Sequence, residues 1–399
     1  MSIRDDLVVN RFLDPPAGAP ASAAVASRPP MGWNTWNWMQ DNVTYRARVA
    51  DLTQDAVLAC ARALVDCGMR DAGYRYVVLD DCWQAPRRAP DGTLAAHPQR
   101  FPDGIAALAE QIHALGLMFG LYSVPGSLTC AQQYDDYGGD PLGSLGFEER
   151  DASTFAAWGV DYLKYDWCRA DVNDGLAAVD AFGRMRRELD RAGRPMVYAI
   201  SEYGLFEPWR WAPGMAHQWR TTEDLLPTWP SILATLDRQA GLAPYARPGA
   251  WNDPDMLQVG NGSLTDGENR AHLYLWALLN APLMAGTDPR RISERTRDLL
   301  CDPDIIAVNQ DWGGRQGERI GPGGAAEVWA KPMSDGGVAV VLLNRSPEVR
   351  EIAVTAAHLP LTSDVRMLRD VGARQAEPFD GRVSRTVPGH DAALLRLQP

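Results

Sequence analysis

The 399-residue chain has no apolar segment long enough to cross a bilayer and no run of Lys or Arg. A membrane-spanning helix needs about 20 consecutive apolar residues, so we expect no membrane association. The formal net charge is −12, and an acidic surface repels the phosphates of nucleic acids. We therefore expect no nucleic-acid partner, and a globular chain large enough for more than one domain.

The sequence also lacks the residue spacings of common metal sites. Its six cysteines include no CxxC pair, and its six histidines include no HExxH motif. Protein zinc sites usually need such spacings. The sequence therefore predicts no metal, and no other cofactor is indicated.

Residues 1–26 lack the pattern of a secretory signal. They begin with charged residues and continue into Pro, Ala and Ser, without an apolar core after a basic start. We therefore expect no signal peptide, and a cytoplasmic location. Disulfides rarely persist in that compartment.

Short apolar runs alternate with amphipathic segments between residues 29 and 312. The strand candidates are 31–36, 74–83, 118–124, 160–168, 196–202, 217–222, 249–255 and 282–287, and the helix candidates include 54–67, 104–115, 176–191 and 269–279. Strands that alternate with helices indicate a parallel sheet, and eight such units predict a closed (β/α)8 TIM barrel. An open doubly wound sheet is the alternative, but it often carries a Gly-rich phosphate turn, which this sequence lacks.

The pattern changes after about residue 312. Segments 327–333, 338–344, 351–357 and 365–369 look like short strands without intervening helices. Ser334-Asp335-Gly336-Gly337 suits a hairpin turn. We predict a small C-terminal antiparallel β-sandwich domain over residues 313–399, with a structural role. Residues 1–28 are then an N-terminal extension.

Charged side chains collect at the predicted strand ends, which meet at one face of a barrel, where active sites lie. Lys164 and Asp166 are two residues apart, and so share one face of a strand. The lysine is expected to keep Asp166 ionised, ready to attack an anomeric carbon. The other charged residues at these ends are Asp80, Asp81, Glu202, Arg220, Asp224, Asp253 and Asp255.

Each of these residues has a simpler explanation when taken alone. An Asp after a strand is often a helix N-cap, a Trp is more often core than ligand platform, and a Lys–Asp pair can be structural. Several carboxylates beside aromatic residues, however, suit a neutral polyol and would repel a phosphorylated ligand. The sequence therefore predicts a carbohydrate substrate, either a small molecule or an oligosaccharide.

Six segments together resemble glycoside hydrolase family 27, the α-galactosidases and α-N-acetylgalactosaminidases of clan D. They are 30–36 (PMGWNTW), 79–83 (LDDCW), 101–104 (FPDG), 162–166 (YLKYD), 219–224 (WRTTED) and 251–256 (WNDPDM). The resemblance extends from about residue 29 to the C-terminus.

The resemblance implies a role for each matching residue. Asp166 is the expected nucleophile and Asp224 the general acid/base, a pair that in retaining glycosidases is about 5–5.5 Å apart. Lys164 is expected to lower the pKa of Asp166, while burial and neighbouring carboxylates raise that of Asp224. The expected substrate-binding residues are Asp80 and Asp81 for the 4- and 6-hydroxyls, Trp36 for stacking, Lys164, Glu202 and Arg220 for the 2- and 3-hydroxyls, and Tyr122 and Asp255 to complete the pocket.

The sequence departs from the family pattern in several places. Ser201 and Ala216 replace a cysteine pair, whereas Cys130 and Cys168 match another family disulfide; in a cytoplasmic protein we expect these two to be thiols. Trp167 follows the nucleophile where Asn or Gly is usual, and we expect it to contact the substrate. The pair Val124-Pro125 and the loop 131–142 also differ, near the leaving group.

The predicted function is a retaining, exo-acting α-galactosidase. Glu202 would fill the space of an N-acetyl group, which disfavours an α-N-acetylgalactosaminidase. A β-L-arabinopyranosidase and an α-1,6-glucan hydrolase remain alternatives. Two remote alternatives are a Schiff-base aldolase that uses Lys164 and a sugar-binding protein without catalysis. Formation of a homo-oligomer is left open.

Overall fold

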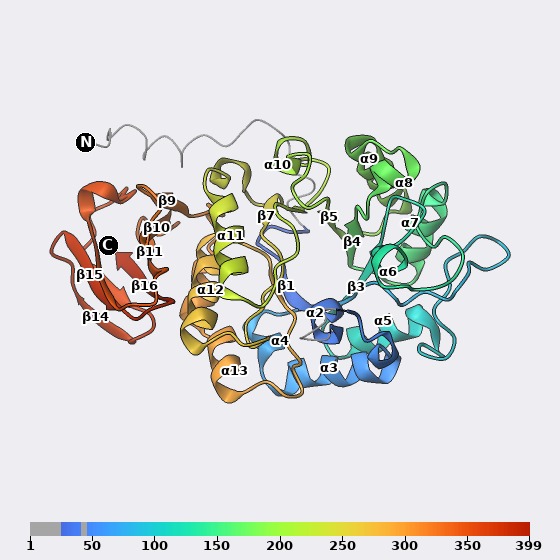
Figure 1. Cartoon of the computed structure of the whole chain (residues 1–399), viewed down its shortest axis with the longest axis horizontal. Helices are drawn as coiled ribbons and strands as arrows, with labels where there is room; N and C mark the ends of the chain where they lie inside the picture. The colour runs from blue at the N-terminus through green and yellow to red at the C-terminus, as the bar shows by residue number, and fades with distance from the viewer. Residues whose placement is uncertain (1–24, 41–45) are drawn as a thin grey trace.

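The computed structural model describes residues 25–40 and 46–399. Most of the predicted N-terminal extension, residues 1–28, lies outside this part of the chain. The described residues form a parallel barrel followed by an antiparallel β unit (Figure 1). The predicted TIM barrel with a C-terminal antiparallel unit is thus confirmed.

Eight parallel strands form the barrel in the order β7-β6-β5-β4-β3-β2-β1-β8. A parallel bridge between Leu257 and Ala285 brings the segment after β7 to β8 and closes the circle. The strands are β1 (Met31–Asn34), β2 (Tyr76–Leu79), β3 (Met118–Ser123), β4 (Tyr162–Asp166), β5 (Val197–Ser201), β6 (Gln218–Arg220), β7 (Trp251–Asp253) and β8 (Leu283–Ala285).

The helices lie outside the strands. Sequence signals set several of their starts: Thr53 caps α3, and Thr265 and Glu268 form a capping box at the start of α12. The longer helices are α3 (Gln54–Asp66), α5 (Gly104–Ala114), α7 (Glu148–Ala157), α9 (Ala178–Ala192), α11 (Trp229–Gln239) and α12 (Asp266–Leu278). The shorter ones are α2 (Thr35–Met39), α4 (Met69–Ala72), α6 (Cys130–Tyr134), α8 (Ala170–Asp174), α10 (Pro208–Trp211), α13 (Glu294–Leu300) and α14 (Pro303–Asn309), with 3-10 turns η2 (Val49–Asp51), η3 (Ala243–Tyr245) and η4 (Ala356–His358).

The barrel strands are shorter than the apolar runs that predicted them. The run 31–36 shows the reason: β1 ends at Asn34, whose side chain accepts a hydrogen bond from the backbone N–H of Trp36 and starts helix α2. This cap moves Trp36 out of the strand and onto the rim of the barrel. Polar residues that follow a strand thus begin the loops that carry the site.

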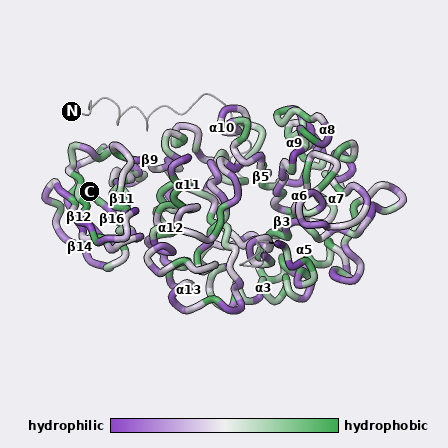
Figure 2. The backbone as a smooth tube through the Cα atoms, viewed as in Figure 1, coloured by the Kyte–Doolittle hydropathy of each residue, from purple (hydrophilic) through white to green (hydrophobic). Residues whose placement is uncertain are grey.

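The C-terminal unit contains a six-stranded antiparallel sheet in the order β14-β13-β16-β11-β10-β9, with the pair β12-β15 packed against it. Its strands are β9 (Glu318–Ile320), β10 (Ala326–Pro332), β11 (Val338–Asn344), β12 (Arg350–Thr355), β13 (Met367–Asp370), β14 (Gln375–Pro378), β15 (Arg382–Val387) and β16 (Asp391–Gln398). The edge strand β14 is exposed and hydrophilic (Figure 2), as expected for an edge that avoids pairing with other chains.

The β unit packs beside helix α12 of the barrel (Figure 1). Trp329, Val341 and Leu394 from the sheet are buried in the same hydrophobic cluster as Leu275 of α12. One face of the six-stranded sheet therefore shares the barrel's core, and the other face forms a separate cluster with β12 and β15. Across the described residues we find no helix with the length and hydropathy needed to span a bilayer.

Candidate active site

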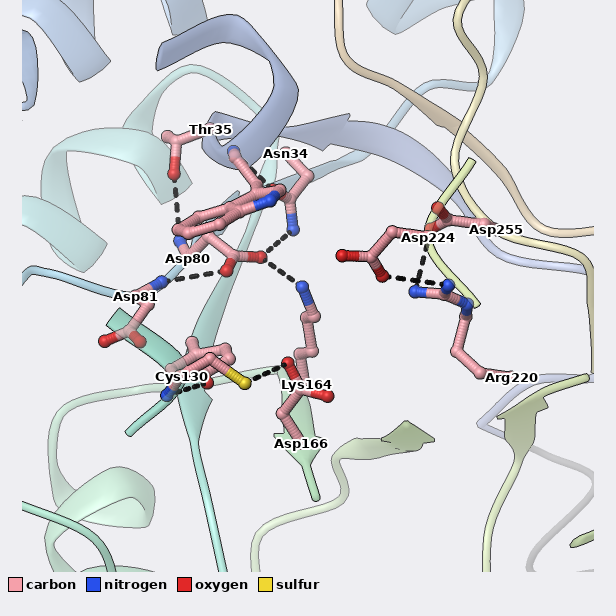
Figure 3. A network of polar contacts seen from close by, with 12 residues as sticks. Asn34, Thr35, Asp80, Asp81, Cys130, Lys164, Asp166, Arg220, Asp224 and Asp255 are labelled. Carbon is pink, nitrogen blue, oxygen red and sulfur yellow. Dashed lines mark hydrogen bonds and ion pairs between the residues drawn. The ribbon is translucent and has the colours of Figure 1, made fainter. Parts of the chain in front are cut away.

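A cavity of about 580 Å³ opens at the carboxyl ends of the barrel strands. Every predicted site residue except Glu202 lines it. The ends of strands β2, β3, β4, β6 and β7 and the start of α2 supply these residues, although they are far apart in the sequence. The predicted convergence of charged strand ends is therefore observed (Figure 3).

Asp166 and Asp224 both line this cavity and lie on opposite sides of it (Figure 3). Asp166 ends β4 and is only 6% exposed. Burial raises the pKa of its carboxyl; Lys164 opposes this effect, and the negative charge of Asp224 adds to it. Lys164 thus lowers the pKa of Asp166 as expected, but burial is the larger effect and the net shift is upward.

The ion pair of Lys164 is with Asp80 and not with its chain neighbour Asp166. Lys164 Nζ lies 2.8 Å from Asp80 Oδ2. Burial lowers the pKa of Lys164, but the charges of Asp80 and Asp166 outweigh burial and raise it. A lysine held in this charged form is a poor Schiff-base nucleophile, so the geometry argues against the aldolase alternative.

Hydrogen bonds fix both carboxylates of the Asp80–Asp81 pair. Asn34 Nδ2 donates to Asp80 Oδ2 over 2.7 Å, and the backbone N–H groups of Cys82 and Ala131 donate to Asp81. Burial raises the pKa of Asp81 to about 7, although the backbone hydrogen bonds lower it. Two oriented carboxyl groups at the cavity wall can accept hydrogen bonds from two nearby sugar hydroxyls, as their predicted role with the 4- and 6-hydroxyls requires.

Arg220 joins two of the predicted carboxylates. Its Nη2 lies 3.0 Å from Asp224 Oδ1, and its Nη1 lies 3.0 Å from Asp255 Oδ1. The side chain of Asp224 is 61% exposed. The expected burial of Asp224 is therefore wrong, because the loop after β6 holds this carboxylate at the cavity mouth.

Glu202 is the one predicted site residue that the structure does not bring to the cavity wall. Its side chain is buried, and its Oε2 accepts a hydrogen bond from the backbone N–H of Phe206 over 2.7 Å. Burial raises the pKa of Glu202 to about 8, although hydrogen bonds from the amides of residues 204–206 lower it. The carboxyl group thus holds the loop after β5, and Tyr203 takes the place at the wall.

The two predicted tryptophans differ in their surroundings. Trp36 lies on the cavity rim, where a sugar ring can stack. Trp167 reaches the wall but is only 1% exposed; its Nε1 donates to Asp171, and its ring packs against Phe182 and Phe206. Its main contacts are therefore with the protein core, and its contact with the substrate stays a prediction.

The mouth of the cavity carries exposed apolar side chains that sequence analysis missed. They are Tyr134, Val172, Leu205 and Leu226. Tyr134 and Val172 lie on the short helices α6 and α8, and Leu205 and Leu226 lie in the loops after β5 and β6. They follow no shared sequence pattern, so only the tertiary structure could identify them.

A disulfide joins Cys130 and Cys168, so the expectation of two thiols is wrong for this structure. Helix α6 and the segment after β4 bring the two Cα atoms to 5.0 Å, which suits a disulfide. Sγ of Cys130 lies 3.6 Å from Asp166 Oδ2. These two sulfurs and Asp166 come within 4.8 Å of one another, but bonded sulfurs are not thiolates and leave only one metal-binding group.

Comparisons with known proteins agree with this architecture. The family described as "Alpha galactosidase A" matches residues 28–311, and the "Alpha galactosidase C-terminal beta sandwich domain" matches residues 323–397. Alpha-galactosidase A of Cellvibrio japonicus is 39% identical over 405 residues, covering 96% of this chain and 95% of that protein. An Arabidopsis thaliana relative, alpha-galactosidase 2, is 41% identical over 348 residues, covering 87% and 83%.

The structural match is equally extensive. Alpha-galactosidase I from Mortierella vinacea superimposes with a TM-score of 0.85 at 32% identity, over 94% of this chain and 98% of that one. The matched regions contain the cavity and all the residues described above. The chain therefore belongs to the α-galactosidase family, glycoside hydrolase family 27.

Proposed function

We propose that the protein is a retaining, exo-acting α-galactosidase that hydrolyses terminal α-D-galactosides. The observation that carries this proposal is that Asp166 and Asp224 come from different strand ends and face one cavity, in a chain of this family. Asp166 is buried and oriented, as a nucleophile needs, and Asp224 is open to the side from which a leaving group and water arrive.

The proposed reaction has two steps. The Asp166 carboxylate attacks C1 of the sugar, while Asp224 donates its proton to the departing glycosidic oxygen. Asp224 then takes a proton from water, which attacks C1 and breaks the ester to Asp166. Two inversions at C1 leave the α configuration unchanged.

The binding groups favour a galactoside among the family substrates. Asp80 and Asp81 offer oriented carboxyl groups at the wall, next to the ammonium of Lys164, and Trp36 offers a face for stacking. Glu202 does not reach this wall, so it gives no support for excluding an N-acetyl group. β-L-arabinopyranosides, α-1,6-glucans and N-acetyl-α-galactosaminides stay as alternative substrates, and a cytoplasmic location stays part of the proposal.

The decisive experiment compares wild type with Asp166→Asn on p-nitrophenyl α-galactoside. We expect kcat to fall at least about 1000-fold, because a nucleophile supplies several kcal/mol of transition-state stabilisation. Asp180→Asn, on the exposed side of α9, is the matched control and should retain activity. Near-normal turnover in Asp166→Asn would refute the assignment.

Two further measurements define specificity and stereochemistry. NMR of the first-formed sugar should show α-galactose, and β-galactose would contradict a retaining reaction. The aryl α-galactoside should be cleaved faster than the matching β-L-arabinopyranoside, α-glucoside and N-acetyl-α-galactosaminide. A sugar-binding protein without catalysis would cleave none of the four.

A further inference from the structure

Tyr203 lies beside the proposed nucleophile, although it was not among the predicted site residues. It follows β5, and its side chain lines the catalytic cavity. Its hydroxyl oxygen lies 3.3 Å from Sγ of Cys130, and the same sulfur lies 3.6 Å from Asp166 Oδ2. The phenol oxygen and the carboxylate oxygen therefore both lie beside the same sulfur of the disulfide.

The donor in this group is fixed by its chemistry. Cys130 is bonded to Cys168 and has no S–H proton to give. An ionised carboxylate is acceptor-only and a far better acceptor than a disulfide sulfur. Among these three groups the Tyr203 hydroxyl is therefore the one with a proton to donate, and Asp166 is the strongest acceptor beside it. Burial raises the pKa of Tyr203 well above its usual value, so the proton stays on the phenol.

The backbone around Tyr203 is held in an uncommon conformation. Tyr203 has φ 62°, in the left-handed region that a bulky side chain rarely adopts. The next residue, Gly204, has φ 76°, and a Cβ there would come within 2.2 Å of the Thr221 carbonyl oxygen. Glu202 holds this turn through the amide of Phe206. This left-handed turn directs the phenol of Tyr203 toward the cavity, which its side chain lines.

The ring of Tyr203 also contacts the opposite side of the site. The guanidinium of Arg220 lies 5.8 Å from the ring centroid, within the range of cation–π attraction. Arg220 in turn forms the ion pair with Asp224. The hydroxyl of Tyr203 thus lies beside the sulfur that contacts Asp166, and its ring lies under the guanidinium that pairs with Asp224.

We propose that Tyr203 is a catalytic residue that donates a hydrogen bond to the Asp166 carboxylate. The inference rests on the function proposed above. The bond stabilises the charged carboxylate in the free enzyme and again when Asp166 leaves C1 in the second step. The proton stays on the phenol throughout, and no bond to Tyr203 forms or breaks.

The test is Tyr203→Phe, with Tyr245→Phe as its matched control. Tyr245 also lies beneath an arginine, with Arg210 6.0 Å from its ring, but it does not line the cavity. We expect kcat on p-nitrophenyl α-galactoside to fall roughly 10- to 100-fold, the worth of a hydrogen bond to a charged group. KM and the melting temperature should change little.

The acid limb of the kcat/KM–pH profile distinguishes the two possible roles of Tyr203. Loss of a purely structural contact would leave the position of this limb unchanged. Without the phenol, Asp166 loses a stabilising donor, so the limb should move to higher pH in Tyr203→Phe and stay in place in Tyr245→Phe. The charged and titratable groups that face Asp166 are Lys164, Asp80, Asp224, Arg220 and Tyr122. All of them are retained in both variants.

The outcomes are distinguishable. An unchanged acid limb, or a loss of activity equal at every pH, would overturn the role of Tyr203. If wild type itself cleaves no galactoside, the proposed function fails instead. A lower melting temperature in Tyr203→Phe with an unmoved limb also counts against the inference, since it indicates a packing role only.

Discussion

Lys164 Nζ lies 2.8 Å from Asp80 Oδ2, so the ion pair at the floor of the cavity links β4 to the end of β2. Asn34 donates to the same oxygen of Asp80 from the end of β1. Three strand ends are therefore tied together at one carboxylate. This arrangement leaves Asp166 with a nearby positive charge but without a direct partner in Lys164.

Lys164→Met should destabilise the protein by about 3–5 kcal/mol, because it leaves Asp80 as a buried carboxylate without its cation. Asp80 is buried in wild type. Asp80→Asn in the same chain should recover part of this loss, since it removes the unpaired charge. Urea unfolding of the two single variants and the double variant measures the coupling. Strictly additive effects would show that the pair is not a stability-determining contact.

Glu202→Gln should make stability less dependent on pH. Burial raises the pKa of Glu202 from 4.5 to about 8, so the folded protein holds the proton more tightly than the unfolded chain. The stability from that proton is fully present below about pH 4.5 and is lost as pH rises through about 8. Between pH 6 and pH 9 the melting temperature of wild type should therefore decrease more than that of Glu202→Gln.

Glu149→Gln, an exposed change on α7, serves as the control for that comparison. It should show the same decrease as wild type between the two pH values. Equal decreases in all three proteins would contradict the burial of Glu202 as its cause. Asp81 and Asp253, with pKa values raised to about 7 and about 6, contribute in the same direction and are present in every variant.

The disulfide should stabilise both the fold and the site. Closing a loop with a sequence separation of 38 residues contributes about 4 kcal/mol in the chain-entropy description. Changing Cys130 and Cys168 together to alanine should lower the unfolding free energy by that order and reduce kcat, because Cys130 Sγ lies beside Asp166. Cys67→Ala, at a free thiol, should change neither quantity much.

Thiol titration checks the disulfide directly. The denatured, unreduced protein should show four thiols, from Cys60, Cys67, Cys82 and Cys301. Six thiols would show that Cys130 and Cys168 are not joined in the isolated protein. That result would also favour the cytoplasmic location, which stays a prediction.

The β unit should unfold together with the barrel. Val341 is buried in the core cluster that contains α12, whereas Val349 is exposed. Val341→Asp should therefore abolish or strongly destabilise the whole fold, since it buries an unpaired charge, and Val349→Asp should be close to neutral. Calorimetry of wild type should show one transition, and two separate transitions would contradict a shared core.

Much of the fold, and the pair of carboxylates proposed to be catalytic, could be predicted from the sequence. Alternation of apolar runs and amphipathic segments predicted the barrel, and the resemblance picked out Asp166 and Asp224. The sequence did not predict Asp80 as the ion-pair partner of Lys164. Spacing along a strand shows which face of the strand a side chain lies on, but not which residue of a neighbouring strand is nearest. The prediction of two thiols at Cys130 and Cys168 rested on the expected compartment. It is wrong because the fold brings their Cα atoms to 5.0 Å, where a disulfide forms.

Glu202 and Tyr203 also show that sequence alone cannot predict which of two neighbouring side chains reaches the site. They are adjacent in the chain, and both follow β5, so local sequence cannot say which one reaches the cavity. The left-handed turn at Tyr203 and the close approach of Gly204 to Thr221 decide it. The contact between Gly204 and Thr221 joins residues 17 positions apart and exists only in the folded protein.

By itself the chain's order of apolar and charged residues determined a closed ring of strands with acidic ends, because side-chain period and burial are local properties of a sequence. Only the tertiary structure decided which charged groups form ion pairs, which carboxyl groups are buried and which aromatic ring lies near Asp166. Those outcomes depend on distances between segments and on the dielectric of the packed interior, and neither exists until the barrel closes.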